Sequence, residues 1–298
     1  MMPRAPAIPW RAAAWRHCLP GNRTCAPSSG AASTRPHRCC GNARMGSGEM
    51  KSRKAWYIGC SAEQVAERVI LLGDPGRVPR FSQYLSDVEA MPVNRGLATV
   101  TGMYGNTRIT LSAFGMGSPI AAIVLHELAN LGASVFLRIG TSIGLSPVNI
   151  GDMIIARNAK SFEGTSSAYA HGAGNSNADP GLVSALTRAA SRREATHHVG
   201  AFASFDGFYQ DMFALDEATE DRVRNNLERL AEQDVLAVDM ETSAILTVGK
   251  ALGCRAGSMC ASTVNSLKKQ KIGKREHAEA ERSLISIALE ALTQVDPA

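Results

Sequence analysis

The sequence predicts a layered α/β fold in which helices cover both faces of a mixed β-sheet. From Lys54 onward, short apolar runs of strand length alternate with longer segments whose apolar residues recur at helical spacing. A turn at residues 104–107 joins two alternating segments and indicates a hairpin within the sheet. Residues 51–298 contain no internal repeat and no linker, so we expect them to form a single domain.

The first half of this domain begins with a buried strand at residues 69–72, which Gly73-Asp74-Pro75-Gly76 must break into a turn before a helix over 77–85. The hairpin strands follow at 98–103 and 107–113. Pro119 suits the first turn of a helix, which we expect over 120–131 because Gly132 then ends it. Further strands are predicted at 135–139 and 153–156.

The second half continues the alternation. Amphipathic helices are expected at 179–191 and 218–232, the second with a strongly charged face. A short strand at 235–238 runs into Asp239-Met240-Glu241, and a helix over 243–252 ends at Gly253. An apolar strand at 256–263 and a long helix at 277–293 complete the pattern.

Residues 1–50 are predicted to lie outside the domain as a disordered tail rich in arginine, proline and alanine. Residues 1–47 hold seven arginines and no acidic residue, which fits a transit peptide or a start assigned too far upstream. Without those arginines, 25 of the 32 basic residues remain against 27 acidic ones. We therefore expect no general attraction to nucleic acid or to a membrane.

Missing motifs exclude several enzyme classes. The sequence has no P-loop, no Gly-x-Gly-x-x-Gly after a strand and no His-Glu-x-x-His. The domain holds only Cys60, Cys254 and Cys260, without the spacing of a zinc site or a disulfide framework. We expect no metal and a reducing, cytoplasmic location, or an organelle if the tail is a transit peptide.

Three positions in the domain need a chemical explanation. The turn after the first strand exposes backbone N–H groups next to Arg77, which is a natural cradle for phosphate or another small oxyanion. Arg138 interrupts an apolar strand, so it is either held in a buried ion pair or part of an oxyanion site with Thr141. Glu241 either begins a helix or binds a sugar diol.

Taken together, these segments resemble the nucleoside phosphorylase family, which contains uridine phosphorylases, bacterial-type purine nucleoside phosphorylases and archaeal methylthioadenosine phosphorylases. The resemblance runs from about residue 55 to the end of the chain. It is carried by Gly73-Asp74-Pro75-Gly76-Arg77, Asn94-Arg95-Gly96, Thr101-Gly102-Met103-Tyr104, Gly115-Met116-Gly117-Ser118-Pro119, Glu127-Leu128, Arg138-Ile139-Gly140-Thr141, Phe208-Tyr209 and Met240-Glu241. It implies a three-layer domain with a mixed, partly barrel-like central sheet.

The resemblance also implies the residue roles. The phosphate site matches Gly73, Arg77, Arg95, Arg138 and Thr141, and the ribose site matches Met240, Glu241 and Tyr57. In the family the arginine that matches Arg95, and the residue that matches Tyr57, come from a neighbouring subunit. This implies a homo-oligomer, a dimer with shared sites or a hexamer built from three such dimers.

The implied reaction is phosphorolysis, in which a nucleoside and inorganic phosphate give a free base and ribose 1-phosphate. The sugar gains oxocarbenium character as the glycosidic bond breaks, and bound phosphate both stabilises and attacks it. Arg138 and Glu241 are the expected catalytic residues. No cofactor is expected beyond phosphate as co-substrate.

A few residues determine which base is bound. The expected base-binding residues are Phe208, Gln210, Val264 and Asn265. Purine enzymes of the family have an aspartate 23 residues after the ribose glutamate, where this chain has Val264. Uridine phosphorylases have Val-Asn there, as here, which favours uridine. Their Gln-x-Arg after the Phe-Tyr pair is incomplete here, because Gln210 follows one residue on and no arginine follows it. A purine nucleoside or methylthioadenosine phosphorylase, and a nucleoside-binding module without catalysis, are the alternatives.

Overall fold

A closed ring of five strands lies at the centre of the part of the chain that the computed structural model describes, residues 54–172 and 174–297. The ring consists of β5 (Val135–Gly144), β9 (Val235–Asp239), β8 (His197–Phe205), β6 (Met153–Phe162) and β10 (Arg255–Asn265), each hydrogen-bonded to the next. β10 pairs back onto β5 in parallel and closes it. Parallel and antiparallel pairs both occur, so the predicted mixed, partly barrel-like sheet is confirmed.

The remaining strands extend this ring into one larger sheet. β1 (Arg68–Leu72) pairs in parallel with both β5 and β4 (Thr107–Ala113), and β3 (Thr99–Tyr104) forms the predicted hairpin with β4. β2 (Ser86–Ala90) lies at one edge, while β7 (Asn175–Asn177) pairs with β6 and β11 (Gln270–Lys271) pairs with β10. The central strands β1, β4 and β5 are almost wholly buried. Burial on both faces explains the apolar runs of β1 and of the first half of β5, whereas the alternating strand β4 also buries Thr110 and Ser112.

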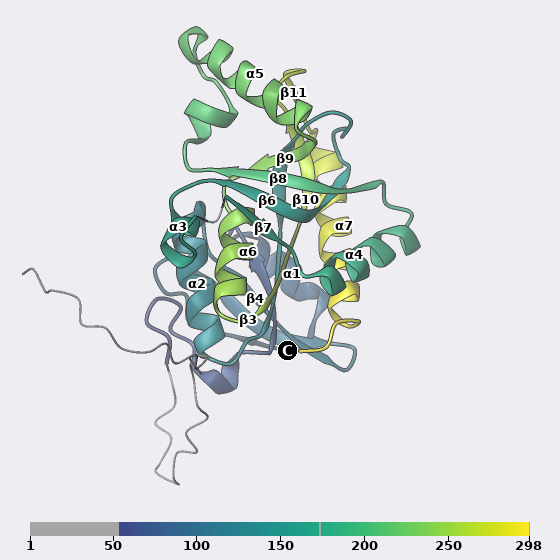
Figure 1. The fold of residues 1–298 in the computed structure, drawn as a ribbon. Helices are drawn as coiled ribbons and strands as arrows, with labels where there is room; N and C mark the ends of the chain where they lie inside the picture. The colour runs from purple at the N-terminus through teal and green to yellow at the C-terminus, as the bar shows by residue number, and fades with distance from the viewer. Residues whose placement is uncertain (1–53, 173, 298) are drawn as a thin grey trace, which may run out of the picture. The chain divides into compact units, whose positions relative to one another are not determined.

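Helices cover the two faces of the sheet (Figure 1). On one face, α2 (Ser118–Asn130) and α6 (Thr242–Ala251) contribute to one buried apolar cluster, and α3 (Thr165–Tyr169) lies beside them. On the other face, α1 (Arg77–Phe81), α4 (Pro180–Arg192) and α7 (Lys274–Leu292) contribute to a second cluster. α5 (Glu217–Glu232) packs over the end of the ring against a third. The three-layer arrangement therefore follows from two apolar sheet faces that need cover.

Local signals in the sequence explain where the helices begin. Asp179 caps α4 by accepting a hydrogen bond from the Leu182 amide, and Pro180 occupies the first helical position. Asp216 caps α5 in the same way through the Thr219 amide. The helix expected at 77–85 is shorter than predicted, because α1 ends at Phe81 and a 3₁₀ turn, Ser82–Tyr84, follows.

Several strands differ from their predicted bounds. β5 and β6 run to Gly144 and Phe162, well beyond residues 139 and 156. The sequence patterns predict neither β8 nor the short strands β2, β7 and β11. β8 was missed because its first residues, His197 and His198, are polar and its interior is rich in alanine.

The predicted tail, residues 1–50, lies outside the described residues.

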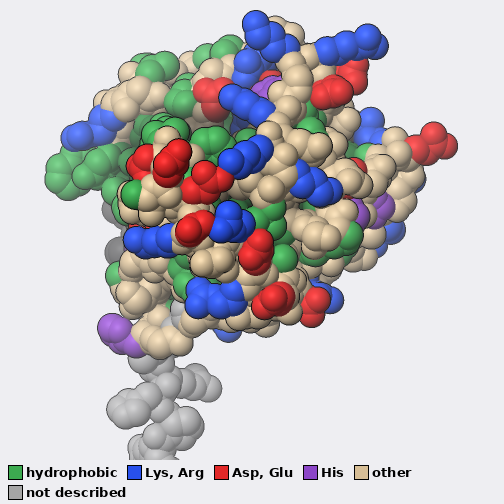
Figure 2. All heavy atoms as spheres, turned by 90° about the horizontal axis from the view of Figure 1, so that it is seen from above, with side chains coloured by type: hydrophobic (Ala, Val, Ile, Leu, Met, Phe, Trp, Pro, Cys, Tyr) green, Lys and Arg blue, Asp and Glu red, His purple; other side chains and the backbone are tan. Residues whose placement is uncertain are grey.

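The face seen from above mixes charges of both signs (Figure 2). Around α5, Arg222 pairs with Asp211, and Lys269 pairs with Glu220. Surface ion pairs of this kind add little stability. No helix within the described ranges is long and apolar enough to cross a membrane.

Candidate active site

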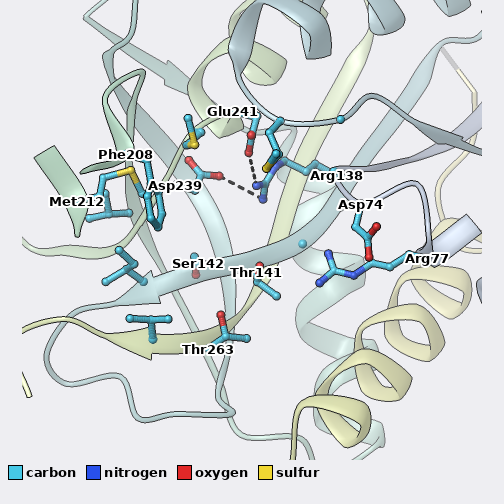
Figure 3. Close-up of a pocket in the computed structure, with 18 of the residues that line it drawn as sticks. Asp74, Arg77, Arg138, Thr141, Ser142, Phe208, Met212, Asp239, Glu241 and Thr263 are labelled. Carbon is cyan, nitrogen blue, oxygen red and sulfur yellow. Dashed lines mark hydrogen bonds and ion pairs between the residues drawn. The ribbon is translucent and has the colours of Figure 1, made fainter. Parts of the chain in front are cut away.

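A pocket of about 500 Å³ opens where several strands of the sheet end (Figure 3). Gly73 follows β1, Phe208 follows shortly after β8, and Met240 follows β9, while Thr141 lies in the last part of β5. Ligands of α/β proteins commonly bind at such carboxyl ends, because loops from several strands converge there. Strand topology thus brings together residues that are far apart in the sequence.

Arg138 lies at one end of this pocket, where its guanidinium contacts Asp239 and Glu241 (Figure 3). Its Nη2 donates to Glu241 Oε2 at 2.6 Å, and its Nη1 lies 3.2 Å from Asp239 Oδ2. The side chain is 4% exposed, and the Nη1 group also donates to the Cys260 sulfur. The two readings of Arg138 left open by the sequence are therefore compatible, because the arginine forms a buried ion pair and faces the pocket.

Burial by itself would lower the pKa of the Arg138 guanidinium, but Cys260, Asp239 and Glu241 outweigh it and raise that pKa above its ordinary value. Burial raises the pKa of the Cys260 thiol to about 11, although Arg138 acts in the opposite direction. At neutral pH the thiol is therefore protonated, and the ion-pair partners of Arg138 are the Asp239 and Glu241 carboxylates.

Glu241 is held by a loop from a different part of the chain. Its Oε1 accepts from the Gly117 amide at 2.7 Å, and the neighbouring Ser118 hydroxyl donates to the Met240 carbonyl at 2.6 Å. Asp239 accepts from the Ser204 hydroxyl at 2.6 Å and from Thr242. The carboxylates on either side of Met240 are thus fixed by hydrogen bonds before any ligand binds.

Arg77 faces the same end of the pocket from the turn after β1 (Figure 3). Its Nε donates to Glu281 Oε1 on α7 at 2.8 Å, and this oxygen also lies 3.2 Å from Arg80. Arg77 is 7% exposed, so its position is set by a partner behind the pocket. We call Arg77, Arg138, Asp239 and Glu241 the charged end of the pocket.

Two glycines make room for this end. A Cβ at Gly140 would lie 3.1 Å from the Arg138 guanidinium, so a side chain there would crowd the arginine. A Cβ at Gly73 would lie 3.2 Å from the Gly115 carbonyl oxygen, where the chain passes close after β4. At both positions the missing side chain lets two segments approach closely.

The opposite end of the pocket is lined by apolar side chains (Figure 3). We call this the apolar end; its members are Ile143, Phe208, Met212, Val238 and Val264. Phe208 is stacked with Phe213 at 6.1 Å between ring centres and meets Tyr209 edge-on at 5.0 Å. The pocket thus combines a polar part suited to anions and hydroxyls with a part suited to a flat, apolar group.

Arg95 and Tyr57 do not line the pocket of their own chain. They lie together elsewhere, with the Arg95 guanidinium 4.6 Å from the centre of the Tyr57 ring. The Asn94 side chain donates to the Tyr57 carbonyl at 2.8 Å, and the Glu127 carboxylate accepts from the amides of residues 56–58. The pair is therefore a preformed unit outside the pocket.

Two of the four predicted base-binding residues line the pocket and two do not. Phe208 and Val264 line the pocket, whereas Gln210 does not and is exposed on the turn after β8. Asn265 lines a neighbouring cavity of about 350 Å³, and its side-chain oxygen accepts from the Lys268 amide. Of the predicted phosphate and ribose residues, six line the pocket: Gly73, Arg77, Arg138, Thr141, Met240 and Glu241.

The sequence patterns do not identify Asp239 as a partner of Arg138, nor Cys260, Met212 and Ser142 as residues of the site. Cys260 lies opposite Gly140 in the β5–β10 register, a neighbour that only the pairing of the strands reveals. Ser142 lies in Gly140-Thr141-Ser142-Ile143-Gly144, which matches the Gly-x-Ser-x-Gly pattern of hydrolases. The structure keeps this segment inside β5, not at a strand-to-helix turn, so it is not a nucleophile elbow.

Known phosphorylases are similar to this chain over most of its length. The model of the phosphorylase superfamily matches residues 67–295. A uridine phosphorylase of Thermococcus kodakarensis is 33% identical over 79% of this chain and 87% of its own length. A guanosine phosphorylase of Halorubrum lacusprofundi is 34% identical over 66% of this chain and 77% of its own length.

A solved structure is also similar. The crystal structure of uridine phosphorylase from Vibrio fischeri superposes with a TM-score of 0.74 at 27% sequence identity. The match covers 83% of this chain and all of that one.

Proposed function

The chain belongs to the phosphorylase superfamily, and from this premise we propose that it is a uridine phosphorylase, a pentosyltransferase that cleaves uridine with inorganic phosphate. The observation that carries the proposal is the single pocket that joins two buried arginines, Arg77 and Arg138, to Glu241 and to an apolar end. Each part matches one part of the reactants: phosphate, ribose and base.

In this proposal, phosphate binds at the charged end between Arg77 and Arg138, with Gly73 and Thr141 beside them. Glu241 accepts hydrogen bonds from the ribose hydroxyls, next to Met240. The oxocarbenium character that develops on the ribose is stabilised by phosphate on one side and by the negative charge of Glu241. Phosphate is the co-substrate, and no step depends on a metal or an organic cofactor.

We propose further that a second copy of this chain completes the site with Arg95 and Tyr57. These two side chains are held together outside their own pocket, and Glu127 and Asn94 fix the segment that carries Tyr57. A third arginine would add to the positive charge of the phosphate site. A homo-oligomer, at least a dimer, is therefore part of the proposal.

A cytoplasmic location also belongs to the proposal. The three cysteines of the described residues are unpaired, which fits a reducing compartment.

A purine nucleoside is the second candidate substrate, because one relative is a guanosine phosphorylase. The pocket has Val264 at the position where purine enzymes of the family have an aspartate, which favours the pyrimidine. Methylthioadenosine falls with the purines on the same ground.

The deciding experiment mixes purified protein with uridine, guanosine, inosine or methylthioadenosine, with and without phosphate, and measures the free base. Uracil release that requires phosphate supports the proposal. Release of a purine base alone would replace uridine with the second candidate. Phosphate-independent cleavage would make the protein a nucleosidase, and binding without turnover would make it a nucleoside-binding module.

A further inference from the structure

The turn after β8 sorts its side chains between the pocket and the solvent. This turn is a single π-helical segment, η3 (Phe208–Met212), closed by a hydrogen bond from the Phe213 amide to the Phe208 carbonyl at 2.9 Å. Met212 is 2% exposed and lines the pocket, whereas Tyr209 and Gln210 face outward. The side chain that reaches the base position is therefore a thioether and not an amide.

Hydrogen bonds outside the pocket fix this choice. The Ser266 hydroxyl donates to the Met212 carbonyl at 3.1 Å, and the Asn226 side chain donates to the Asp211 carbonyl at 3.0 Å. Arg222 also pairs with the Asp211 carboxylate at 2.8 Å. A rotation of the turn that exchanged Met212 for Gln210 would break these three contacts.

The apolar end offers few groups that can read the polar edge of a base. A thioether is a weak acceptor and cannot donate. The polar side chains beside it are hydroxyls, Ser142 and Thr263, and the Ser142 hydroxyl is buried without a hydrogen-bond partner among the described residues. The Asp239 carboxylate is already engaged by Arg138, Ser204 and Thr242.

The Ser142 and Thr263 hydroxyls can each pair with a carbonyl oxygen of a pyrimidine, but bases that differ only by a methyl group present the same carbonyl oxygens, so these hydroxyls do not distinguish them. Discrimination must then come from packing against the apolar side chains. An added methyl group gains from burial in such a pocket, by about fourfold in affinity for one carbon.

We propose that Met212 sets the base preference of this enzyme, and that the apolar end favours pyrimidine nucleosides with an apolar group on the base, 5-methyluridine over uridine. This inference rests on the proposed function, since it assigns the apolar end to the base. Met212 acts by packing beside Phe208, and the Ser142 hydroxyl binds a carbonyl oxygen that both bases share.

The test compares kcat/KM for uridine and 5-methyluridine at saturating phosphate in three forms of the full chain: wild type, Met212→Leu and Met212→Gln. We expect the wild type to favour 5-methyluridine about fourfold. The leucine variant is the matched control and keeps this preference, because leucine and methionine are similar in size and both apolar. The glutamine variant loses the preference, with a ratio of about one, because its polar amide replaces the apolar surface on which the methyl group is buried, while both bases present the same polar edge.

A wild type that favours uridine would overturn the proposal, as would a glutamine variant that folds and keeps the wild-type ratio. If the glutamine variant does not fold, the ratio of the wild type and of the leucine variant still decides.

Calorimetric binding of the two nucleosides without phosphate separates this inference from the proposed function. Tighter binding of 5-methyluridine without turnover supports the base preference and overturns the proposed reaction. Phosphate-dependent cleavage that favours uridine supports the reaction and overturns the preference, and binding of neither nucleoside overturns both.

Discussion

The charged and the apolar ends of the pocket are built in different ways. At the charged end, the arginines and carboxylates each have a named partner from another part of the fold, as Arg77 has on α7 and Glu241 has at Gly117. At the apolar end, the side chains are apolar and meet by packing. Hydrogen bonds depend on exact geometry, whereas packing tolerates exchange of similar volumes. We therefore expect substitutions at the charged end to have much larger effects.

The strongest test of this comparison is Arg138. Replacing Arg138 by alanine removes the proposed donor to phosphate and leaves the Asp239 and Glu241 carboxylates buried without their cation. We expect kcat/KM to fall by about 10³-fold or more. Arg138→Lys keeps the charge and helps folding, but it loses the planar fork, so we expect a large loss there too. Steady-state kinetics with circular dichroism separates lost function from lost structure. A lysine variant with wild-type activity would contradict the role of the fork.

A second test asks whether the charged end is complete within one chain. We expect Arg95→Ala to lose about 10²-fold in kcat/KM, because the proposed third arginine of the phosphate site disappears. When this variant is refolded together with Arg138→Ala, a mixed dimer contains one pocket with an intact Arg138 and a partner with an intact Arg95. Activity should then return to about a quarter of the wild type if subunits pair at random. An assay of the mixture against each variant alone checks this, and no recovery would place Arg95 outside the shared site.

The apolar end should respond more gently. Phe208→Ala removes an aromatic wall and is expected to raise KM for the nucleoside by about tenfold while kcat changes little. Phe208→Leu, which retains most of the apolar area, is the matched control, and its KM should lie between those of the wild type and of Phe208→Ala. Initial rates over a range of nucleoside concentrations give the split between KM and kcat. A fall in kcat with an unchanged KM would show that Phe208 acts on the transition state and not on binding.

The same difference explains what the sequence could predict. Arg138 and Glu241 were identified because charges inside apolar segments stand out, and the glycine turn before Arg77 is visible as a motif. The fold class followed from the alternation of strands and helices. The predicted bounds of β5 and β6 are too short, because the polar pairs Thr141-Ser142 and Arg157-Asn158 interrupt the apolar run of each strand.

Other features were beyond the reach of the sequence for a physical reason. Met212 reaches the pocket and Gln210 does not, because the turn is π-helical, and no propensity of these residues indicates that geometry. Cys260 contacts Arg138 only because β10 lies next to β5 in a register that brings residue 260 opposite residue 140. Sequence patterns report the periodicity of single elements and not the register between elements.

The smallest effect on activity is expected behind the charged end, at Glu163. This carboxylate accepts hydrogen bonds from the Ser161 and Ser243 hydroxyls at 2.8 and 2.9 Å, and also from Ser166. The Ser243 amide in turn donates to the Ser204 hydroxyl, the donor to Asp239. Glu163 therefore supports the charged end indirectly, through Ser243 and Ser204.

Burial alone would raise the pKa of Glu163, but the hydrogen bonds, from Ser166 first, outweigh it and lower that pKa below its usual range. A carboxyl with a lowered pKa stabilises the folded state above its unfolded-state pKa of about 4.3, and this stabilisation is lost as the pH falls through the folded-state pKa. Glu163→Gln should therefore reduce the free energy of unfolding by about 1–3 kcal/mol at pH 7 and by less at acid pH. Urea unfolding at neutral pH and below pH 4.3 measures the two differences.

Because Glu163 touches neither phosphate nor nucleoside in the proposed site, kcat/KM should stay within about threefold of the wild type. A much larger fall in kcat/KM, with stability unchanged, would show that the order of the charged end depends on Glu163, although three residues connect it to Arg138.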